Sequence, residues 1–432
     1  MLPFPESFLA GEREPSESTL IALVHPDDAP PSADDVQDAL DELGISVDEV
    51  REPEEPPDQG WAVEFLFDPE QAPGQAALGG WLRIWLEPVA DGSYADLEAR
   101  IDGPDFEHVQ SARWQLGLSV NFGEEPLAAF HQQLRLLNAL VPNPALLLDA
   151  DAFAPRPASW LRDLAESDIP PSPSTLYSIH AVTGDAGDDV WLHTHGMLRT
   201  GYPDLDLLGI PQSDSNLGAE LLGRVAALFL NQGPPPPGER FEIGRDLDLA
   251  WLAWEDGLKR LSGSSVGGSA DREDDAHTGL RAVIVAPTEV GYESVARHLP
   301  TLRDNPLLYV SHAETQRMML LASERLPRFL NLLGSHASDP GWAFLVKLGF
   351  PVNAEPDGGK EHLWFQVHGL IDGQVDATLT NQPFAVALEL GQRGLHSLDQ
   401  LTDWTIVSPF GRFDPDAILN LERKLQRGAT LN

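Results

Sequence analysis

The sequence predicts an α+β protein built from two or three mixed layers whose sheets are largely antiparallel. Segments that alternate apolar and polar residues, such as 363–367 and 375–379, indicate strands with one buried face. Apolar residues with helical spacing, clearest in 126–141, indicate helices that pack on those sheets. The turn signal Asp372-Gly373 favours a hairpin and therefore antiparallel pairing.

Composition limits the class of protein. A chain of 432 residues with 42% hydrophobic residues and 11 tryptophans can build two or three real cores. No apolar run is long enough for a membrane span, and the first ten residues lack the features of a secretory signal. The chain has no cysteine, which excludes disulfides, thiolate nucleophiles and cysteine-based zinc sites. We therefore expect a cytoplasmic protein.

Charge is the strongest compositional signal. The chain carries 68 Asp and Glu against 28 Lys and Arg, a formal net charge of −40. Such a surface repels nucleic-acid backbones and anionic lipids, so we expect neither nucleic acid nor membrane as a partner. Solubility or life at raised salt explains the charge most simply. Attraction to a basic partner is the alternative.

The first predicted domain spans residues 1–168. Its expected strands are 19–24, 61–67, 81–86, 114–120 and 145–148, and its expected helices begin at Ser32, Pro126 and Trp160. Ser32 with Asp35 has capping spacing, and Gly44 ends that helix. Asp149 and Asp151 follow a buried strand, a position that suits chemistry but more often caps a turn.

The second predicted domain spans residues 172–305 and follows a proline-rich hinge at 169–174. Segments 176–182 and 190–196 predict a hairpin, 217–228 a helix and 281–286 a strand, whereas 247–254 fits either strand or helix. Segment 262–278 is rich in Gly, Ser and Asp and predicts a disordered loop.

The second domain also carries a recognisable motif. W-L-H-T-H-G-x-x-R-x-G-x-P-x-L-D at 191–206, preceded by L-Y-x-I-H-A-V at 176–182, resembles an uncharacterised bacterial family of unknown function. The resemblance extends over much of residues 1–300. It implies a domain order in which such a region precedes a further C-terminal module, and it implies no chemistry.

His193 and His195 are two residues apart on an expected strand, so both imidazoles face the same side. This is the spacing of a His-x-His metal pair, which Asp204, Asp206 or His180 would complete. The alternative, which we favour from the sequence, is a hydrogen-bonded pair of histidines beside Trp191. We expect Arg199 and Asp204 to form an ion pair that holds the segment after the hairpin.

The third predicted domain, residues 306–432, begins with a helix capped by Ser311 and Glu314. Pro327 predicts a kink or two abutting helices. A two-residue turn at Asp372-Gly373 would place apolar residues opposite polar ones, so we predict a bulge at Gly369 or a three-residue loop. Asp414 and Pro415 predict the start of a closing helix.

The polar and aromatic residues of this third domain form an ordered pattern. Glu361-His362-x-Trp364, Asn381-x-Pro383 and Asp403-Trp404 together resemble a bacterial domain of unknown function. The resemblance supplies no catalytic residues. We expect Asp403 to accept the indole or a backbone N–H of Trp404 and so fix a corner. A ligand-binding groove lined by His362, Trp364 and Trp404 is the alternative.

No nucleophile elbow, no phosphate-binding loop and no cofactor motif is found in the sequence. We therefore expect a non-enzymatic binding or interaction protein for an unknown protein or small molecule, with a basic partner as one option. The alternative is a metal-dependent hydrolase built on His193 and His195. Metal content after purification distinguishes the two. The sequence does not indicate the oligomeric state.

Overall fold

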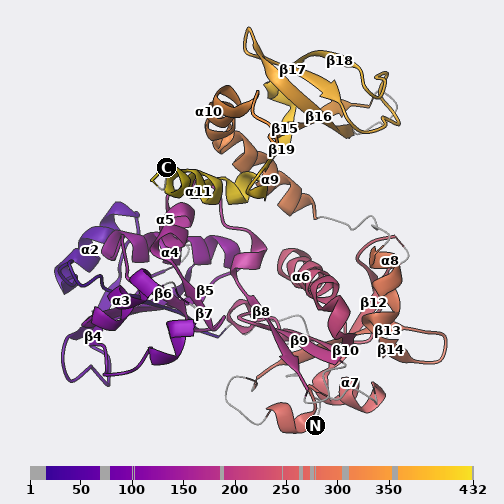
Figure 1. Cartoon of the computed structure of the whole chain (residues 1–432). Helices are drawn as coiled ribbons and strands as arrows, with labels where there is room; N and C mark the ends of the chain where they lie inside the picture. Colours follow the sequence, from indigo (N-terminus) through magenta and orange to yellow (C-terminus); the bar gives the residue numbers. More distant parts are fainter. Residues whose placement is uncertain are drawn as a thin grey trace. The chain divides into compact units, whose positions relative to one another are not determined.

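The computed structural model describes residues 16–68, 78–99, 101, 103–184, 189–245, 247–261, 266–272, 277, 279–303, 311–352 and 359–430. The chain divides into two compact units, Met1–Val310 and Ser311–Asn432, coloured from indigo to orange and from orange to yellow in Figure 1. Both combine mostly antiparallel sheets with helices, so the predicted α+β class is confirmed. Within the described ranges, no helix is long and apolar enough to span a bilayer.

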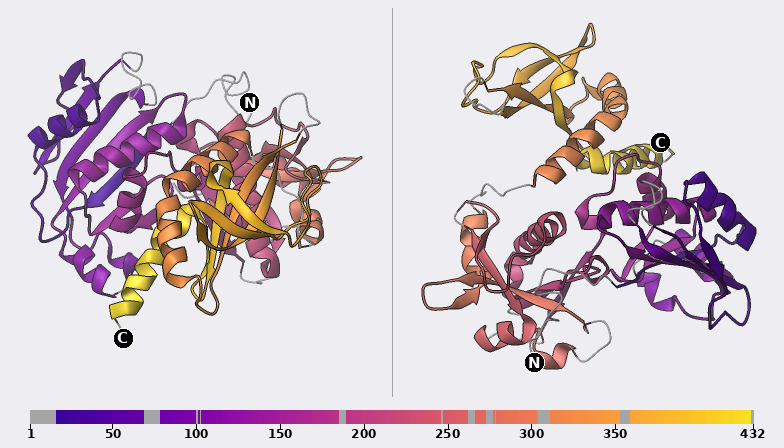
Figure 2. Two further views of the ribbon diagram at one scale, coloured as in Figure 1. Left: turned by 90° about the horizontal axis from the view of Figure 1, so that it is seen from above. Right: turned by 180° about the vertical axis from the view of Figure 1, so that it is seen from behind.

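The first sheet of the Met1–Val310 unit has the order β2-β3-β4-β5-β1-β6-β7 and is antiparallel throughout. Its strands are β1 (Ser18–Leu23), β2 (Glu49–Arg51), β3 (Trp61–Leu66), β4 (Leu78–Pro88), β5 (Trp114–Phe122), β6 (Leu146–Asp149) and β7 (Ala154–Arg156). The helices are α2 (Ala33–Glu42), α3 (Gly103–Ser111), α4 (Pro126–Leu140) and α5 (Ala158–Ala165). α4 lies along one face of this sheet (Figure 2). As predicted, Ser32 and Asp35 form a capping box at the start of α2.

The second sheet of this unit has the order β11-β12-β13-β10-β9-β8, with β14 paired to β13. Its strands are β8 (Ser178–Thr183), β9 (Asp189–His195), β10 (Asp204–Pro211), β11 (Phe241–Glu242), β12 (Asp248–Ala253), β13 (Arg281–Pro287) and β14 (Tyr292–Ser294). Only β10 and β13, among the described pairs, are parallel. The helices are α6 (Ser215–Gln232), α7 (Trp254–Arg260) and α8 (Leu299–Arg303). The ambiguous segment 247–254 is therefore a strand, and a helix begins at its last residue.

Helices cover both faces of the second sheet. On α6, a Cβ added at Gly218 would lie 2.7 Å from Leu192 Cδ1, so α6 packs closely on the face to which Leu192 points. On α7, a Cβ added at Gly257 would lie 2.6 Å from Val283 Cβ. Val283 is the register partner of Asp206, and Asp206 is the partner of His193. Because register partners share a face, α7 covers the face that carries the odd-numbered residues of β9.

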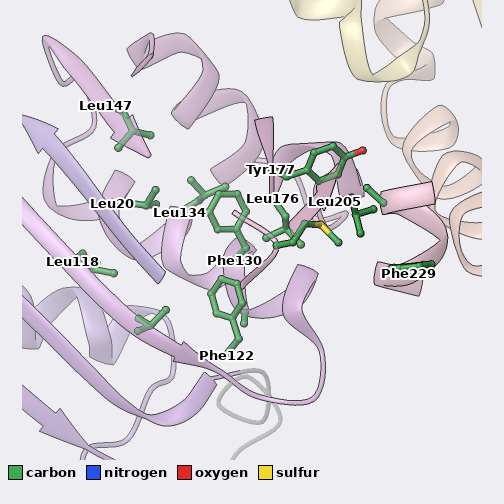
Figure 3. Packing of buried hydrophobic residues seen from close by; sticks show 14 of the residues in the cluster. Leu20, Leu118, Phe122, Phe130, Leu134, Leu147, Leu176, Tyr177, Leu205 and Phe229 are labelled. Atoms are coloured by element: carbon green, nitrogen blue, oxygen red, sulfur yellow. The ribbon is translucent and has the colours of Figure 1, made fainter. Parts of the chain in front are cut away.

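The two sheets of the Met1–Val310 unit share one hydrophobic core. The main cluster of buried apolar side chains runs without interruption from β1 to α8. We call the segment that forms the first sheet the first part of the unit, and the segment that forms the second sheet the second part. Figure 3 shows Phe122 and Phe130 of the first part close to Leu176 and Leu205 of the second part. The guanidinium of Arg199, from the second part, lies 4.7 Å from the ring centre of Phe130 in α4. The predicted boundary at 168–172 thus falls within a continuous core.

The Ser311–Asn432 unit has its own sheet, with the antiparallel order β18-β17-β16-β15-β19-β20. Its strands are β15 (Ala343–Pro351), β16 (Lys360–Ile371), β17 (Gln374–Leu379), β18 (Arg393–Ser397), β19 (Leu401–Ser408) and β20 (Gly411–Phe413). The helices are α9 (His312–Glu324), α10 (Leu326–His336) and α11 (Ile418–Thr430). Helix and strand residues of this unit form a separate apolar cluster that includes Phe329, Phe365, Trp404 and Leu421.

Local predictions in this unit are confirmed with one correction. Pro327 lies in the first turn of α10, so the predicted helix is two abutting helices. The β16–β17 register shifts between Val367 and Gly369, which is the predicted bulge. The Ser311 hydroxyl accepts a hydrogen bond from the Glu314 N–H, but the Glu314 carboxylate does not complete a capping box. It binds the guanidinium of Arg317 instead, because an ion pair is available three residues along the same helix.

Candidate metal centre

The β8–β9 hairpin brings three histidines together. His193 and His195 alternate along β9 and project from one face. The antiparallel register places His180 directly opposite His193 and Ser178 opposite His195. One ligand nitrogen from each of His180, His193 and His195 lies within 4.8 Å of the others. The sequence suggested Asp204, Asp206 or His180 as a third ligand, and the structure places His180 beside His193 and His195.

A fourth histidine reaches the same place from a distant segment. The Nε2 atoms of His277 and His193 are 3.2 Å apart, and the ring centres of His277 and His195 are 5.3 Å apart. Two nitrogens bound to one tetrahedral zinc, each about 2.0–2.1 Å from the ion, would be about 3.4 Å apart. The His193–His277 separation fits two ligands of the same ion. Below, the four-histidine cluster means His180, His193, His195 and His277.

Sequence reasoning missed His277. It lies in segment 262–278, which was predicted to be a disordered loop. Its described part, residues 266–272 and 277, contributes the buried side chains of Val266 and Arg272 as well as His277. The remaining residues of that segment lie outside the described ranges. A lone histidine in an acidic, glycine-rich stretch has no spacing relative to another ligand, so nothing in the local pattern identifies it.

The cluster is partly buried, and burial controls its protonation. His193 and His195 are 1% and 3% exposed, whereas His180 and His277 are half-buried. Desolvation lowers the pKa of His193 far below its ordinary value, and the positive charges of the other three histidines and Arg281 lower it further. Among the described residues, no group accepts from or donates to Nδ1 of His193. His193 is therefore held neutral, which is the form that binds metal ions.

An aromatic ring and two arginines border the cluster. The ring of Trp191 stacks on His193 at 4.1 Å between centres and lies 4.9 Å from the ring of His277. The guanidinium of Arg272 also packs on the ring of Trp191, 4.5 Å from its centre. Arg281 donates to the backbone carbonyl of Thr194, between the two histidines of β9. The cluster thus lies next to fixed positive charge.

The two acidic residues that the sequence offered as third ligands are engaged elsewhere. The buried carboxylate of Asp206 accepts hydrogen bonds from Trp191 Nε1 and Arg272 Nη1, both at 2.9 Å, and from Arg281 Nη1 at 3.5 Å. Asp204 accepts from the Thr194 hydroxyl and the Met197 N–H. Burial raises the pKa of Asp204 to about 6, although Arg281 opposes the rise. Both carboxylates support the hairpin and do not join the four-histidine cluster.

Arg199 does not pair with Asp204 as predicted. Its guanidinium forms a two-pronged ion pair with Asp149, at 3.0 and 2.9 Å, and both side chains are fully buried. Asp151 lies 3.7 Å from the same guanidinium. Burial raises the pKa of Asp151 to about 6. Asp149 also caps the next turn, as expected, because its Oδ1 accepts from the Ala152 N–H at 3.1 Å. Through Arg199, the two aspartates hold the first sheet to the segment that follows the histidine hairpin.

The turn after the hairpin depends on glycine. Gly196 has φ of 108°, and an added Cβ would lie 2.5 Å from the carbonyl oxygen of Leu176. No residue with a side chain fits this position without moving the backbone. Phe153, which has the unusual positive φ of 48°, packs edge to face on His195, with 4.8 Å between the two ring centres. The first part of the unit thus contacts the cluster directly.

The ligand groove proposed for the Ser311–Asn432 unit is not assembled. Trp404 is fully buried, packs on Phe329 and donates its indole N–H to the carbonyl of Ala322 in α9. Trp364 is the register partner of Lys347, whereas Trp404 is the partner of Val346, so the two tryptophans project from opposite faces. His362 lies with Trp364 and is 3.1 Å from the Thr402 hydroxyl. As expected, Asp403 accepts a backbone N–H of Trp404, at 2.8 Å.

Comparison with known proteins identifies the family. Residues 18–171 match the N-terminal model, and residues 179–285 the C-terminal model, of a protein of unknown function named DUF4026. No curated protein and no solved structure gives a significant match. The resemblance suggested for the third domain stays a prediction. The two models together match more than half of the chain in tandem, and the protein therefore belongs to the two-part DUF4026 family of unknown function.

Proposed function

We propose that the Met1–Val310 unit binds a divalent transition-metal ion of the zinc class through the four-histidine cluster. The observation that supports this most strongly is convergence. Two neighbouring strands and a distant segment bring four imidazoles to one place, with ligand nitrogens of three within 4.8 Å and the fourth 3.2 Å from His193. This differs from the hydrogen-bonded histidine pair that we favoured from the sequence, and it takes up the metal-binding alternative for His193 and His195.

The donor set determines the class of ion. Four imidazole ligands without thiolate or carboxylate suit zinc, copper, nickel or iron, and do not suit calcium or magnesium, which prefer oxygen ligands. Burial keeps His193 neutral, so metal binding does not compete with a proton there. A metal ion would also explain why such close imidazoles are gathered around a desolvated ring. Hydrogen bonds alone connect pairs of histidines and do not require four.

The number of ligands favours binding over hydrolysis. Catalytic zinc sites use three protein ligands and leave a position for water, whereas four protein ligands close a tetrahedral site. With His277 as a ligand, the four-histidine cluster fills all positions. The hydrolase that the sequence allowed remains the second candidate, supported by the half-buried position of His277. The expectation of a basic protein partner rests on net charge alone and stays a prediction.

Metal analysis of the full chain tests the proposal. The protein is purified without a metal-binding tag, exposed to Zn²⁺, freed of excess ion and analysed for metal by mass spectrometry. We expect about one zinc per chain, lost in His193→Ala and retained at lower affinity in His277→Ala. Spectra of the Co²⁺-loaded chain would report tetrahedral coordination.

A matched control separates metal loss from unfolding. His131, in α4 of the same unit, is also buried, and its Nε2 lies 3.0 Å from the carbonyl of Leu164, outside the cluster. His131→Ala should retain zinc even if it lowers the melting temperature. A wild-type chain that remains folded and holds none of Zn²⁺, Cu²⁺, Ni²⁺ or Co²⁺ would refute the metal site and return the cluster to a structural role.

A further inference from the structure

Two buried arginines lie beside the four-histidine cluster. Arg272 is 7% exposed and Arg281 is 2% exposed. Both donate to the carboxylate of Asp206, Arg272 to Oδ2 and Arg281 to Oδ1. Arg272 also contacts the ring of Trp191, which in turn stacks on His193, and the charge of Arg281 acts directly on His193. The arginines and the histidines therefore form one continuous polar site.

Each arginine has an N–H group without an acceptor. Among the described residues, Nη2 of Arg272 and Nε of Arg281 are fully buried and make no hydrogen bond. A buried donor on a charged group is strongly unfavourable when it makes no hydrogen bond. Two such donors, on arginines that both bind the carboxylate of Asp206, point to an acceptor that the described residues do not supply.

Charge balance leads to the same conclusion, and this step rests on the proposed metal site. A bound divalent ion and two arginines bring four positive charges. The buried carboxylates that the described residues place beside them are Asp206, which binds both arginines, and Asp204, which interacts with Arg281. Buried charge that is not compensated is strongly unfavourable, so the loaded site needs an anion.

We propose that Arg272 and Arg281 bind a small oxyanion, a phosphate or carboxylate group, next to the metal ion. The planar guanidinium presents several N–H groups in a fixed arrangement that matches the oxygens of such groups. The same anion would satisfy both free donors and neutralise the ion.

Calorimetric titration of the zinc-loaded full chain, after removal of excess zinc, tests the inference. Inorganic phosphate, sulfate and acetate are titrated separately. Comparing the affinities for phosphate and sulfate with the affinity for acetate distinguishes a phosphate-type from a carboxylate-type ligand. We expect saturable binding of at least one of them at one site per chain. By reciprocity, the same anion should tighten zinc binding. No binding of any of the three anions would overturn the proposal.

Variants assign the anion to the arginines. Arg272→Gln and, more conservatively, Arg281→Lys should weaken the anion by about tenfold or more while one zinc per chain is retained. Arg325, equally buried and bonded to the Pro415 carbonyl in the other unit, provides the control Arg325→Gln, which should leave anion affinity unchanged. Anion affinity that is unchanged in both arginine variants would mean that the metal alone binds the anion, and would also overturn the proposal.

Failure of the metal site remains distinguishable. Zinc content is measured before the titration, so a folded chain without metal refutes the four-histidine site on its own. The same anions are then titrated into the metal-free chain. Binding that depends on Arg272 would still support the arginine site, and absence of binding would refute it.

Discussion

Arg199 connects the two sheets of the Met1–Val310 unit through a single side chain. Its guanidinium binds Asp149 with two hydrogen bonds, and its Nε and Nη2 atoms donate to the Leu176 carbonyl. The ion pair is excluded from water, so removing one partner leaves the other charge buried and unpaired. The residue is therefore more important for folding than an exposed ion pair of similar geometry.

We expect Arg199→Ala to lower the free energy of unfolding of this unit by about 3–5 kcal/mol. Urea unfolding of the full chain measures the loss. Arg297→Ala is the control, because the pair between Arg297 and Glu293 is largely exposed and should contribute less than about 1 kcal/mol. Equal effects of the two substitutions would contradict the role assigned to Arg199.

Asp403 makes a pH-dependent contribution to the Ser311–Asn432 unit. Desolvation raises the pKa of this carboxyl to about 6, although the Trp404 N–H and Lys347 oppose the rise. The folded state thus holds the proton more tightly than the unfolded chain. The stability that the group contributes is complete below pH ~4 and is lost as the pH rises through about 6.

We expect Asp403→Asn to stabilise the unit by about 1–3 kcal/mol at pH 7, and the variant and wild type to become equally stable near pH ~4. An asparagine oxygen still accepts the Trp404 N–H, so the corner is kept. Melting temperatures measured from pH 4 to pH 8 show the convergence. A constant difference across that range would rule out titration of Asp403 as the cause.

At the residue scale, the sequence predicts which side chains share a face when they lie on the same strand. His193 and His195 share a face because side chains alternate along any strand. The faces of Trp364 and Trp404 depend on how two strands pair with β15, and that register is not visible in either segment. His277 depends on the path of a long connection. The sequence therefore predicts the His193 and His195 pair of the candidate site, but not the contribution of His277.

At the scale of elements, α7 lies close to the sheet because of one glycine. A Cβ added at Gly257 would lie 2.6 Å from Val283 Cβ, a branched atom of the strand that cannot turn away. Gly223, in the middle of α6, has only ordinary contacts, the nearest being Tyr177 Oη at 3.5 Å. The same substitution should therefore have opposite effects in the two helices.

We expect Gly257→Ala to destabilise the unit by about 1–3 kcal/mol, because the helix must move off β13. Gly223→Ala should stabilise it by about 0.5–1 kcal/mol through helix propensity. Thermal unfolding of both variants provides the measurement. A stabilising Gly257→Ala would mean that α7 does not pack as closely on Val283 as its position indicates.

Element types were largely predictable, because periodicity and caps are local. The bulge in β16 was predictable from a conflict: a two-residue turn at Asp372 and Gly373 and a continuous apolar face cannot both hold without one extra residue. Both turn residues have positive φ, as a tight hairpin requires. The parallel pairing of β10 with β13 had no local signal, since segments far apart in the sequence form it.

At the scale of the whole molecule, the Ser311–Asn432 unit has a complete core of its own. When residues 311–432 are expressed alone, we expect them to unfold in one cooperative step and to give dispersed amide signals in nuclear magnetic resonance spectra. A fragment with exposed hydrophobic surface and no cooperative transition would show that the unit depends on the rest of the chain.

The continuous core of the Met1–Val310 unit has a consequence for how this family is inherited. The two family models meet between residues 171 and 179, and the buried apolar cluster and the Arg199–Asp149 pair both extend across that junction. A gene that encoded only one half would leave that half's share of the core exposed to water. We therefore expect gene fusion or fission to add or remove domains outside this unit, and to keep its two halves together in one chain.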